Sequence, residues 1–322
     1  MTFAAYKVGM LMFPAADYVG KVTVKNISIP DYIIDVQNLK INVIDDKFVR
    51  SNFPKRENNS QKGDYGKVLV IAGSAGMTGA AYLSSQTAVT TGSGLVTLAV
   101  PSSLNSAMEA KTTEVMTVPL SDRNGRISAN AIDEILKCVD KADTVLIGPG
   151  LGRCDDVSEV VESVLEYSKV PVIIDADGIN AVAENMKALS SCTCPVIFTP
   201  HTVEMSRLTG LVTAKEFAEE NGVTLILKGH HTIVTGQDGE QYINITGNSG
   251  LATGGSGDVL AGTVASLVSR GINETVASAM AVYIHGLAGD IAKDKYGIES
   301  VTASKVMECI PCALRQILQV EN

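Results

Sequence analysis

The chain has 322 residues, 45% of them hydrophobic and 19% charged, which is enough apolar material for a buried core and excludes global disorder. At about 150 residues per domain, this length accommodates roughly two domains or one large one. A net charge of −9 and an aromatic content of 5% without Trp argue against a nucleic-acid partner and base-stacking surfaces, and favour a soluble cytoplasmic protein with no membrane partner.

The N-terminal part of the chain does not share the pattern of the rest. Residues 1–30 predict no helix of their own, and residues 21–25 alternate like an exposed strand. Residues 52–63 are polar and indicate a linker. We therefore place a boundary near residue 50, which divides the chain into residues 1–50 and a larger domain of residues 51–322.

Between residues 65 and 227 the chain alternates between short apolar runs and helix-like segments. The expected strands are residues 67–72, 95–100, 144–147, 172–175, 196–199 and 224–227. The expected helices include residues 79–91, 129–139, 156–167 and 202–209. Continuous apolar strands separated by helices indicate an α/β protein with a mostly parallel sheet that is covered on both faces.

The carboxyl ends of these strands carry loops that are rich in glycine or acidic residues. These loops are Gly-Ser-Ala-Gly at 73–76, Gly-Pro-Gly-Leu-Gly at 148–152, Asp-Ala-Asp at 175–177 and Thr-Pro-His at 199–201. In sheets of this kind ligands bind beyond the carboxyl ends of the strands. The order of strands and loops therefore predicts a binding site at this one edge of the sheet.

The pattern changes after residue 227. Residues 232–235 and 241–245 flank Gln-Asp-Gly at 237–239, which predicts a β-hairpin. A glycine-rich loop follows, and then three expected helices at residues 258–270, 273–293 and 303–320. His285 and Asp290 interrupt the most apolar of these helices, so we do not interpret it as a membrane span.

Six cysteines are too few for a disulfide scaffold in a chain of this length. Cys309 and Cys312 have the spacing of a redox or zinc pair, but no second pair with that spacing completes a zinc site, since Cys192 and Cys194 are one residue too close. We expect structural or incidental thiols and no metal held by protein ligands, with a metal or redox site at Cys309 and Cys312 as the alternative.

The strongest chemical signal is Gly-Gly-Ser-Gly-Asp at residues 254–258. Its glycines let the backbone present N–H groups without obstruction, and a helix N-terminus follows, which together make an anion site. Asp258 would repel a bound phosphate unless it served as a general base for an attacking hydroxyl. The alternative is that Asp258 caps the helix and the glycines form a turn. Neither a Walker A loop nor a Gly-x-Gly-x-x-Gly motif after the first strand is present.

Seven short motifs occur in one order along the chain. They are Lys-Gly-Asp-Tyr-Gly at 62–66, Gly-Ser-Ala-Gly-Met-Thr-Gly-Ala at 73–80, Gly-Pro-Gly-Leu-Gly at 148–152, Asp-Ala-Asp at 175–177, Thr-Pro-His at 199–201 with Glu-Met at 204–205, Lys-Gly at 228–229, and the stretch from Gly-Asn at 247–248 to Asp258. The last resembles the anion hole of ribokinase-like kinases, and the whole order resembles the ADP/ATP-dependent NAD(P)H-hydrate dehydratases over about residues 50–322.

This resemblance implies a three-layer α/β/α ribokinase-like fold and a repair reaction. The family removes water from NAD(P)H hydrate at the expense of ADP or ATP, with ADP favoured here. The implied path is phosphorylation of the ring hydroxyl and elimination of phosphate, with Mg²⁺ implied by the phosphoryl chemistry. Asp258 would be the base, and the amides of Gly255, Ser256 and Gly257 would hold the transferred phosphoryl group.

The same resemblance assigns two groups of binding residues. Those implied to contact the nucleotide are Lys228, Gly229, His230, His231, Thr232 and Gly257. Those implied to contact the hydrate are Ala80, Gly150, His201 and Asp258.

Several of these residues have simpler interpretations. His201 would then only close a loop, and Lys228 would be a solvated lysine at the end of a strand. Asp175 and Asp177 would cap the next helix. We expect His285 to be a packing residue.

The sequence departs from the family at two places. Thr202 and Val203 stand where the family usually has Pro-Gly, which questions the shape of that loop but not His201 or Glu204. His230 and His231 replace smaller residues, so contacts there would be made by the backbone.

Residues 1–50 add a second resemblance. Thr2-Phe3, Lys7-Val-Gly9, Pro14, Gly20 and Ile27-Ser-Ile-Pro30 resemble the end of the NAD(P)H-hydrate epimerase domain. We interpret this segment as a remnant of that domain plus a linker, and we expect no epimerase activity.

Two other functions stay open. One is a ribokinase-like kinase of a vitamin or small alcohol, and the other is a non-catalytic nucleotide-binding protein, against which an intact Asp258 argues. The resemblance also implies a homo-oligomer, such as a tetramer.

Overall fold

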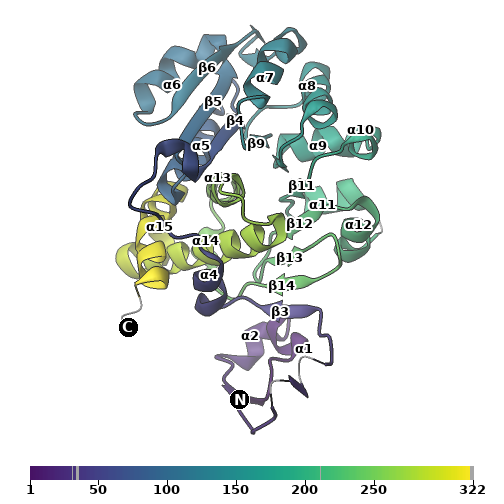
Figure 1. Ribbon diagram of the computed structural model, residues 1–322, viewed down its shortest axis with the longest axis vertical. Coiled ribbons are helices and arrows are strands. Elements are labelled where there is room, and N and C mark those ends of the chain that lie inside the picture. Colours follow the sequence, from purple (N-terminus) through teal and green to yellow (C-terminus); the bar gives the residue numbers. More distant parts are fainter. Residues whose placement is uncertain (31, 34–35, 211, 320–322) are drawn as a thin grey trace.

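The structure is a computed structural model that describes residues 1–30, 32–33, 36–210 and 212–319. Within these residues the chain builds one ten-stranded sheet, with two small two-stranded sheets beside it (Figure 1). The strands of the large sheet are, in spatial order, β3 (Ile41–Val43), β14 (Gln241–Ile243), β13 (Ile233–Thr235), β12 (Thr224–Leu227), β11 (Val196–Phe198), β10 (Val172–Ile174), β9 (Thr144–Ile147), β4 (Lys67–Ile71), β5 (Leu95–Pro101) and β6 (Met116–Leu120).

Neighbouring strands of the large sheet are parallel, except that β13 is antiparallel to both β12 and β14. The expected mostly parallel sheet is therefore confirmed, and so is the hairpin after residue 227. The central strands β9 and β10 are buried along their whole length. Their uninterrupted runs of β-branched and leucine side chains fit a sheet that is covered on both faces.

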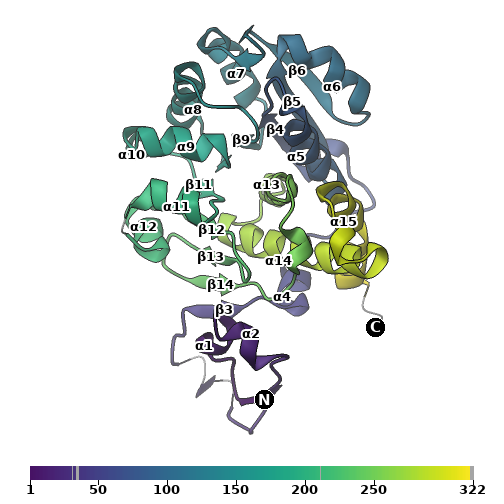
Figure 2. The same cartoon turned by 180° about the vertical axis from the view of Figure 1, so that it is seen from behind.

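Helices cover the two faces of the sheet in separate layers (Figures 1 and 2). One face carries α4 (Asp46–Asn52), α5 (Thr78–Thr91), α6 (Asn105–Lys111), α13 (Ser256–Ser269), α14 (Glu274–Tyr296) and α15 (Ala303–Leu318). The other carries α7 (Ile132–Val139), α8 (Asp155–Tyr167), α9 (Asp177–Glu184), α10 (Lys187–Ser191), α11 (Thr202–Thr209) and α12 (Ala214–Asn221). The three-layer α/β/α architecture is thus confirmed.

Short 3₁₀ helices connect several of these elements. They are η1 (Lys62–Tyr65), η2 (Ser102–Leu104), η3 (Ala129–Ala131), η4 (Ser249–Leu251) and η5 (Ile298–Ser300). The expected end of the last helix at Val320 lies outside the described residues.

The long helix α14 packs inside the fold. It is the one helix of the described residues with the length and apolar character that a membrane span needs, yet 67% of its most apolar window is buried inside the structure. Burial of this extent is what the core helix of a folded domain shows. Its neighbour α13 is buried along almost its whole length, which places the glycine-rich loop before it against the centre of the sheet.

The N-terminal segment differs from expectation in two ways. Residues 1–30 were expected to lack helices, but α1 (Val8–Leu11) and α2 (Ala16–Val19) form single helical turns there. The strand expected at residues 21–25 is reduced to β2 (Val24–Lys25), which pairs in parallel with β1 (Thr2–Phe3). Leu11 of α1 is buried, and short helices of this kind owe their stability to packing against the rest of the chain.

The large sheet also begins before residue 51. β3 adds to β14 at the sheet edge, where Gln241 N donates to Lys40 O at 2.7 Å and Ile44 N donates to Ile243 O at 3.0 Å. Ile44 and Val49 are fully buried in the core beneath α14 and α15. Structurally, residues 41–52 therefore belong with the larger domain, whereas the origin of the first 40 residues stays a prediction.

Candidate active site

A cavity of about 770 Å³ opens at the carboxyl edge of β10, β11 and β12. Residues 244–258 and α14 form its opposite wall. The cavity therefore lies at the edge of the sheet where the glycine-rich and acidic loops predicted a binding site. The predicted site residues that line it are His201, Lys228, Gly229, His230, Thr232, Gly255, Ser256, Gly257 and Asp258. Residues about 200 to 258 in sequence thus converge on one space.

The glycine-rich loop turns sharply into α13 at Gly255. This residue is the N-cap, with a φ of +91° that L side chains rarely adopt, and a Cβ there would lie 2.5 Å from Leu83 Cδ1. The helix begins at Ser256, two residues earlier than expected. Because Gly255 holds the capping position, the interpretation of Asp258 as the N-cap is wrong.

The first turn of α13 presents backbone donors to the cavity. The amide of Ser256 is partly used, since it donates to Thr253 O at 3.3 Å. In the described part of the chain, the amides of Gly255 and Gly257 have no protein acceptor. Free amides at a helix N-terminus, where the helix dipole is positive, form an anion site.

Asp258 follows these amides, in the first turn of α13. Burial raises the pKa of its carboxyl group to about 7, with a further contribution from the charge of Asp175 and an opposing one from Lys228. A carboxyl group with this pKa is partly ionised near neutral pH and partly protonated. Such a group is suited to accept a proton from a substrate hydroxyl.

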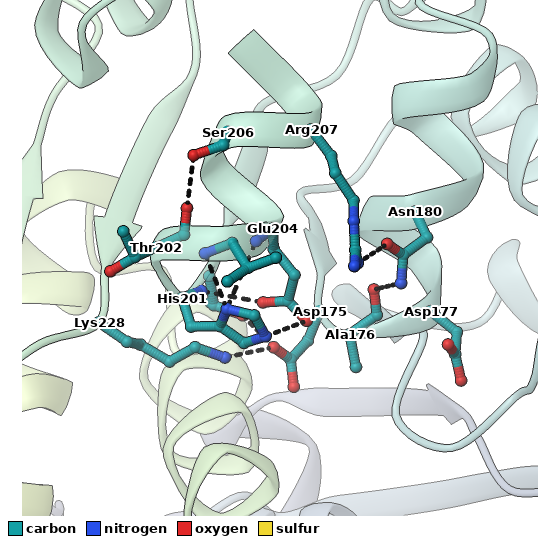
Figure 3. A network of polar contacts seen from close by, with 12 residues as sticks. Asp175, Ala176, Asp177, Asn180, His201, Thr202, Glu204, Ser206, Arg207 and Lys228 are labelled. Atoms are coloured by element: carbon teal, nitrogen blue, oxygen red, sulfur yellow. Dashed lines mark hydrogen bonds and ion pairs between the residues drawn. The ribbon is translucent and has the colours of Figure 1, made fainter. Parts of the chain in front are cut away.

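Lys228, which follows β12, is paired with the buried carboxylate of Asp175, which follows β10 on the far side of β11 (Figure 3). Its Nζ atom lies 3.0 Å from Asp175 Oδ1, which also accepts a hydrogen bond of 2.5 Å from the Thr199 hydroxyl. The Asp175 side chain is 1% exposed. Burial would lower the pKa of Lys228, but the carboxylates of Asp175, Glu204 and Asp258 outweigh it and raise that pKa. The lysine is therefore a fixed cation and not a freely solvated one.

This cation faces the anion loop. A Cβ at Gly257 would lie 3.4 Å from Lys228 Nζ, so the ammonium group lies directly beside the first turn of α13. Asp175 is not a helix cap, because its carboxylate contacts Lys228 and Thr199 instead. One ammonium group and two free amides therefore face the same part of the cavity.

His201 has a structural role as well as a place at the cavity. It is the N-cap of α11, where its Nδ1 atom accepts from Val203 N at 3.1 Å and Glu204 accepts from His201 N at 2.9 Å. This reciprocal capping box fixes the loop in which Thr202 and Val203 replace the Pro-Gly that is usual in the family. The simpler interpretation of His201 as a residue that closes a loop is thus part of its role, and its half-exposed ring still faces the cavity.

The two adjacent histidines point to different places. His230 lines the cavity, and its ring stacks on that of His231 with centroids 4.5 Å apart. His231 does not line the cavity, because its Nδ1 atom contacts the carbonyl oxygen of Leu11 in the N-terminal segment. A nucleotide contact from His231 would have to come from its backbone.

Ala80 and Gly150 lie together, but outside the wall of the cavity. A Cβ at Gly150, whose φ is +64°, would lie 3.0 Å from Ala80 Cβ. Ser74 donates a hydrogen bond of 2.8 Å to Gly150 O and so ties the loops after β4 and β9 to each other. Asp177 fixes the same loop from the other side, because it accepts from Gly152 N at 2.8 Å. The sheet edge therefore carries two adjacent regions.

His285 also belongs to the site, although no sequence pattern assigns it there. It lines the cavity from α14, and its Nε2 atom lies 3.2 Å from the hydroxyl of Ser256. Burial lowers its pKa to about 4, so the ring is neutral at physiological pH. The expectation of a packing residue is incomplete, because this histidine also holds the first side chain of the anion loop.

A second missed group supports the opposite wall. Asp290 accepts from Gly247 N and from Asn248 Nδ2, both at 2.9 Å. Asn244 donates to Thr246 O and to Val282 O, both at 3.1 Å. The contacts of Asp290 with Gly247 and of Asn244 with Val282 join residues 43 and 38 positions apart, so no local pattern in the sequence predicts them.

The cysteines lie apart from the cavity. All six are free thiols, and Cys309 and Cys312 lie on α15. Among the described residues, no group of three or more His, Cys, Asp or Glu side chains is arranged to hold a metal ion.

Comparisons with known proteins give one consistent family. The family model described as NAD(P)H-hydrate dehydratase matches residues 68–312. The chain is 38% identical over 328 residues to the bifunctional NAD(P)H-hydrate repair enzyme Nnr of Moorella thermoacetica, and the match covers 98% of this chain and 62% of that protein. It is 35% identical over 276 residues to the ADP-dependent (S)-NAD(P)H-hydrate dehydratase of Staphylococcus aureus, covering 83% of this chain and 95% of that one.

Solved structures agree with the architecture. A ribokinase-like superfamily protein of Enterococcus faecalis has a TM-score of 0.76 and 29% identity, with 87% of this chain and 97% of that chain covered. An ADP/ATP-dependent NAD(P)H-hydrate dehydratase of Bacillus subtilis, co-crystallized with ATP/Mg²⁺, has a TM-score of 0.71 and 28% identity, with 86% and 98% covered. The ribokinase-like fold is confirmed by these likenesses. The chain spans about three fifths of the length of its bifunctional relative.

Proposed function

Because this chain belongs to the NAD(P)H-hydrate dehydratase family, we propose that it uses ADP or ATP to remove water from NAD(P)H hydrate and so restores the reduced cofactor. The observation that carries the proposal is the pairing of Asp258, whose pKa is raised to about 7, with an anion loop that has free amides. A base and an anion site that adjoin in one turn of helix are the two parts that phosphorylation of a hydroxyl requires.

The nucleotide would occupy the cavity of about 770 Å³. Lys228 would hold its terminal phosphoryl group beside the amides of Gly255 and Gly257, and Asp175 would keep the ammonium group in place. Gly229, His230 and Thr232 line the cavity next to Lys228 and are our proposed further contacts to the nucleotide, with a backbone contact from His231.

The hydrate would approach from the side of Ala80, Gly150 and His201. Asp258 would take the proton of its ring hydroxyl, and the oxygen would bond to the terminal phosphorus as the bond from that phosphorus to the nucleotide breaks. The C–O bond then breaks with release of inorganic phosphate, and loss of a proton from the neighbouring ring carbon forms the double bond. Ser256, held by His285, would keep the anion loop in shape during the transfer.

Mg²⁺ fits this site only as a partner of the nucleotide. The described residues offer no cage of three or more acidic or histidine ligands, and Mg²⁺ commonly binds through substrate phosphates with one or two carboxylates. When bound it would neutralise charge on the phosphates. The relative from Bacillus subtilis that was co-crystallized with ATP/Mg²⁺ supports this arrangement. We further propose a cytoplasmic homo-oligomer.

The test is recovery of the absorbance of reduced nicotinamide from purified NADH hydrate and NADPH hydrate. We expect recovery that depends on nucleotide, with ADP more effective than ATP, and release of one phosphate per turnover. Absence of recovery with both nucleotides would contradict the proposal. Accumulation of a stable phosphorylated alcohol from another substrate would instead favour a ribokinase-like kinase.

A further inference from the structure

A small hairpin covers the loops that follow β4 and β9. It consists of β7 (Asp122–Arg123) and β8 (Arg126–Ile127), and the two turn residues between them have positive φ. Gly125 O accepts a hydrogen bond of 2.8 Å from Ala75 N, which ties the turn to the loop after β4. Asp122 accepts hydrogen bonds from Ser102 and Ser103 at the base of the hairpin. The hairpin is therefore held in place at both ends.

Arg126 reaches from this hairpin over Gly152. A Cβ at Gly152, whose φ is +78°, would lie 3.0 Å from Arg126 Nε and 3.5 Å from Arg126 Cδ. The space above this glycine is thus filled by an arginine side chain. Gly150, two residues earlier in the same loop, contacts Ala80, which places Arg126 at the border of the proposed hydrate region.

The charge of Arg126 is not balanced by the protein. Within the described ranges, no carboxylate lies within 4.0 Å of its guanidinium group, whereas the adjacent Arg153 lies 3.8 Å from Asp177. Arg123 is its direct cross-strand partner, so both side chains are on one face of the hairpin. Like charges directly opposite one another destabilise a strand pair. Two exposed arginines in this arrangement place two positive charges side by side on one face of the hairpin.

We infer that Arg126, with Arg123 beside it, binds a phosphate group of the dinucleotide substrate. This inference rests on the proposed function, which brings a substrate with a pyrophosphate, and in the NADPH form an additional ribose phosphate, to the adjacent loop. The planar guanidinium group matches two phosphate oxygens at once. These residues lie outside the nucleotide cavity, so the subsite serves the hydrate and not ADP.

The experiment compares Arg126→Ala with Arg315→Ala, which removes the same charge from an exposed position on α15. We expect Arg126→Ala to raise the KM for the hydrate roughly tenfold to hundredfold, the range for loss of a charged hydrogen bond, with the KM for ADP and kcat unchanged. Arg126→Lys should recover part of the loss, Arg123→Ala should show a smaller one, and Arg315→Ala should show none.

The two hydrates distinguish the source of the phosphate. An effect confined to NADPH hydrate assigns Arg126 to the ribose phosphate, and an equal effect on both hydrates assigns it to the pyrophosphate. Unchanged KM values for both hydrates in an active enzyme would overturn this inference and leave the proposed function intact. If the chain shows no dehydration, fluorescence titration with NADPH tests the inference independently of activity. A higher Kd for NADPH in Arg126→Ala than in wild type would support it, and an equal Kd would overturn it.

Discussion

The Nζ atom of Lys228 lies 3.0 Å from the buried carboxylate of Asp175. Lys228 follows β12 and Asp175 follows β10, so the ion pair spans the end of β11, which lies between them. This ion pair fixes the only side-chain cation that lines the cavity within the described residues beside the amides of α13. Because Asp258 is close to both charges, its proton affinity is set by the balance between Asp175 and Lys228 as well as by burial. The Lys228–Asp175 ion pair therefore both positions the ammonium group and influences the strength of Asp258 as a base.

The first prediction concerns the pH dependence of the reaction. The pKa of Asp258 is raised to about 7 by burial and by Asp175, and only the ionised carboxylate accepts a proton. We expect kcat/KM for the hydrate to rise with pH to a plateau, with half of its maximum near pH 7. Asp258→Asn should lower kcat by about 10²–10⁴-fold and leave ADP binding measurable by calorimetry. An active Asp258→Asn variant would remove this residue from the mechanism.

The second prediction concerns Asp175. Replacing it with asparagine removes the negative charge that raises the pKa of Asp258, and leaves Lys228 to act on Asp258 alone. The acid limb of the kcat/KM profile should therefore move to lower pH. Thr199→Val is the matched control, since it removes the hydrogen bond of 2.5 Å to Asp175 but keeps the charge. A profile of Asp175→Asn with an unchanged acid limb would show that the two carboxylates do not interact.

The central strands of the large sheet, and the helices between them, could be predicted because burial on both faces leaves a continuous apolar run in each strand. The two edge strands, β3 and β6, could not be predicted. β6 contains Pro119 and polar Thr117, which conceal an edge strand, where proline is tolerated. β3 has three residues, including the polar Asn42, and exists only because β14 offers an open edge. The partner of β3 lies 200 positions away in the sequence, since Ile41 pairs with Gln241, so no local pattern shows this strand.

The position of the cavity could likewise be predicted from local sequence patterns, whereas the contacts between its residues could not. The loops at the carboxyl ends of the strands predicted at which edge of the sheet the cavity lies, and the glycine pattern predicted the anion loop around Gly255. The contact of Lys228 with Asp175 depends on the order of β10, β11 and β12 in space, which a list of strands does not contain. The apolar pattern of α14 predicts a packing role for His285, and no local pattern shows that this helix lines the cavity beside the anion loop.

The third prediction concerns stability. The pKa of Asp258 in the folded state is raised from 3.8 to about 7, so the folded state binds a proton more tightly than the unfolded state. Below about pH 4 both states are protonated and the group has no effect; between the two pKa values stability falls as pH rises, and above pH 7 the full cost remains. Asp258→Asn should therefore raise Tm, by little at pH 4 and by a constant larger amount above pH 7.

Asp122 provides a control of opposite sign. Hydrogen bonds from Ser102 and Ser103 lower the pKa of this carboxyl group below 3.8, so its ionised form stabilises the folded state above that pH. Asp122→Asn should lower Tm at neutral pH, and the difference should shrink as pH falls through the folded-state pKa. Melts of both variants, run from neutral pH down to below the folded-state pKa of Asp122, would contradict the linkage argument if both shifts had the same sign at neutral pH.

The fourth prediction separates the two neighbouring glycines of the anion loop. Gly255 has a φ of +91°, and a Cβ there would meet Leu83 and Ala303, whereas a Cβ at Gly254 would meet nothing within 4 Å. Gly255→Ala should cost about 1–2 kcal/mol of folding free energy for the left-handed backbone, with overpacking adding to this. Gly254→Ala should cost much less, because neither strain nor contact opposes it.

The same pair also reports on function. If Gly255 relaxes its backbone to accept a methyl group, the amides of residues 255 and 257 turn away from Lys228, and the phosphoryl group loses donors that act in the transition state. We therefore expect Gly255→Ala to lower kcat by more than it raises the KM for ADP, and Gly254→Ala to change both only slightly. Denaturant titration gives the stability term and initial rates with saturating hydrate give the kinetic term. Equal losses in the two variants would show that glycine density, and not the turn at Gly255, is what the loop requires.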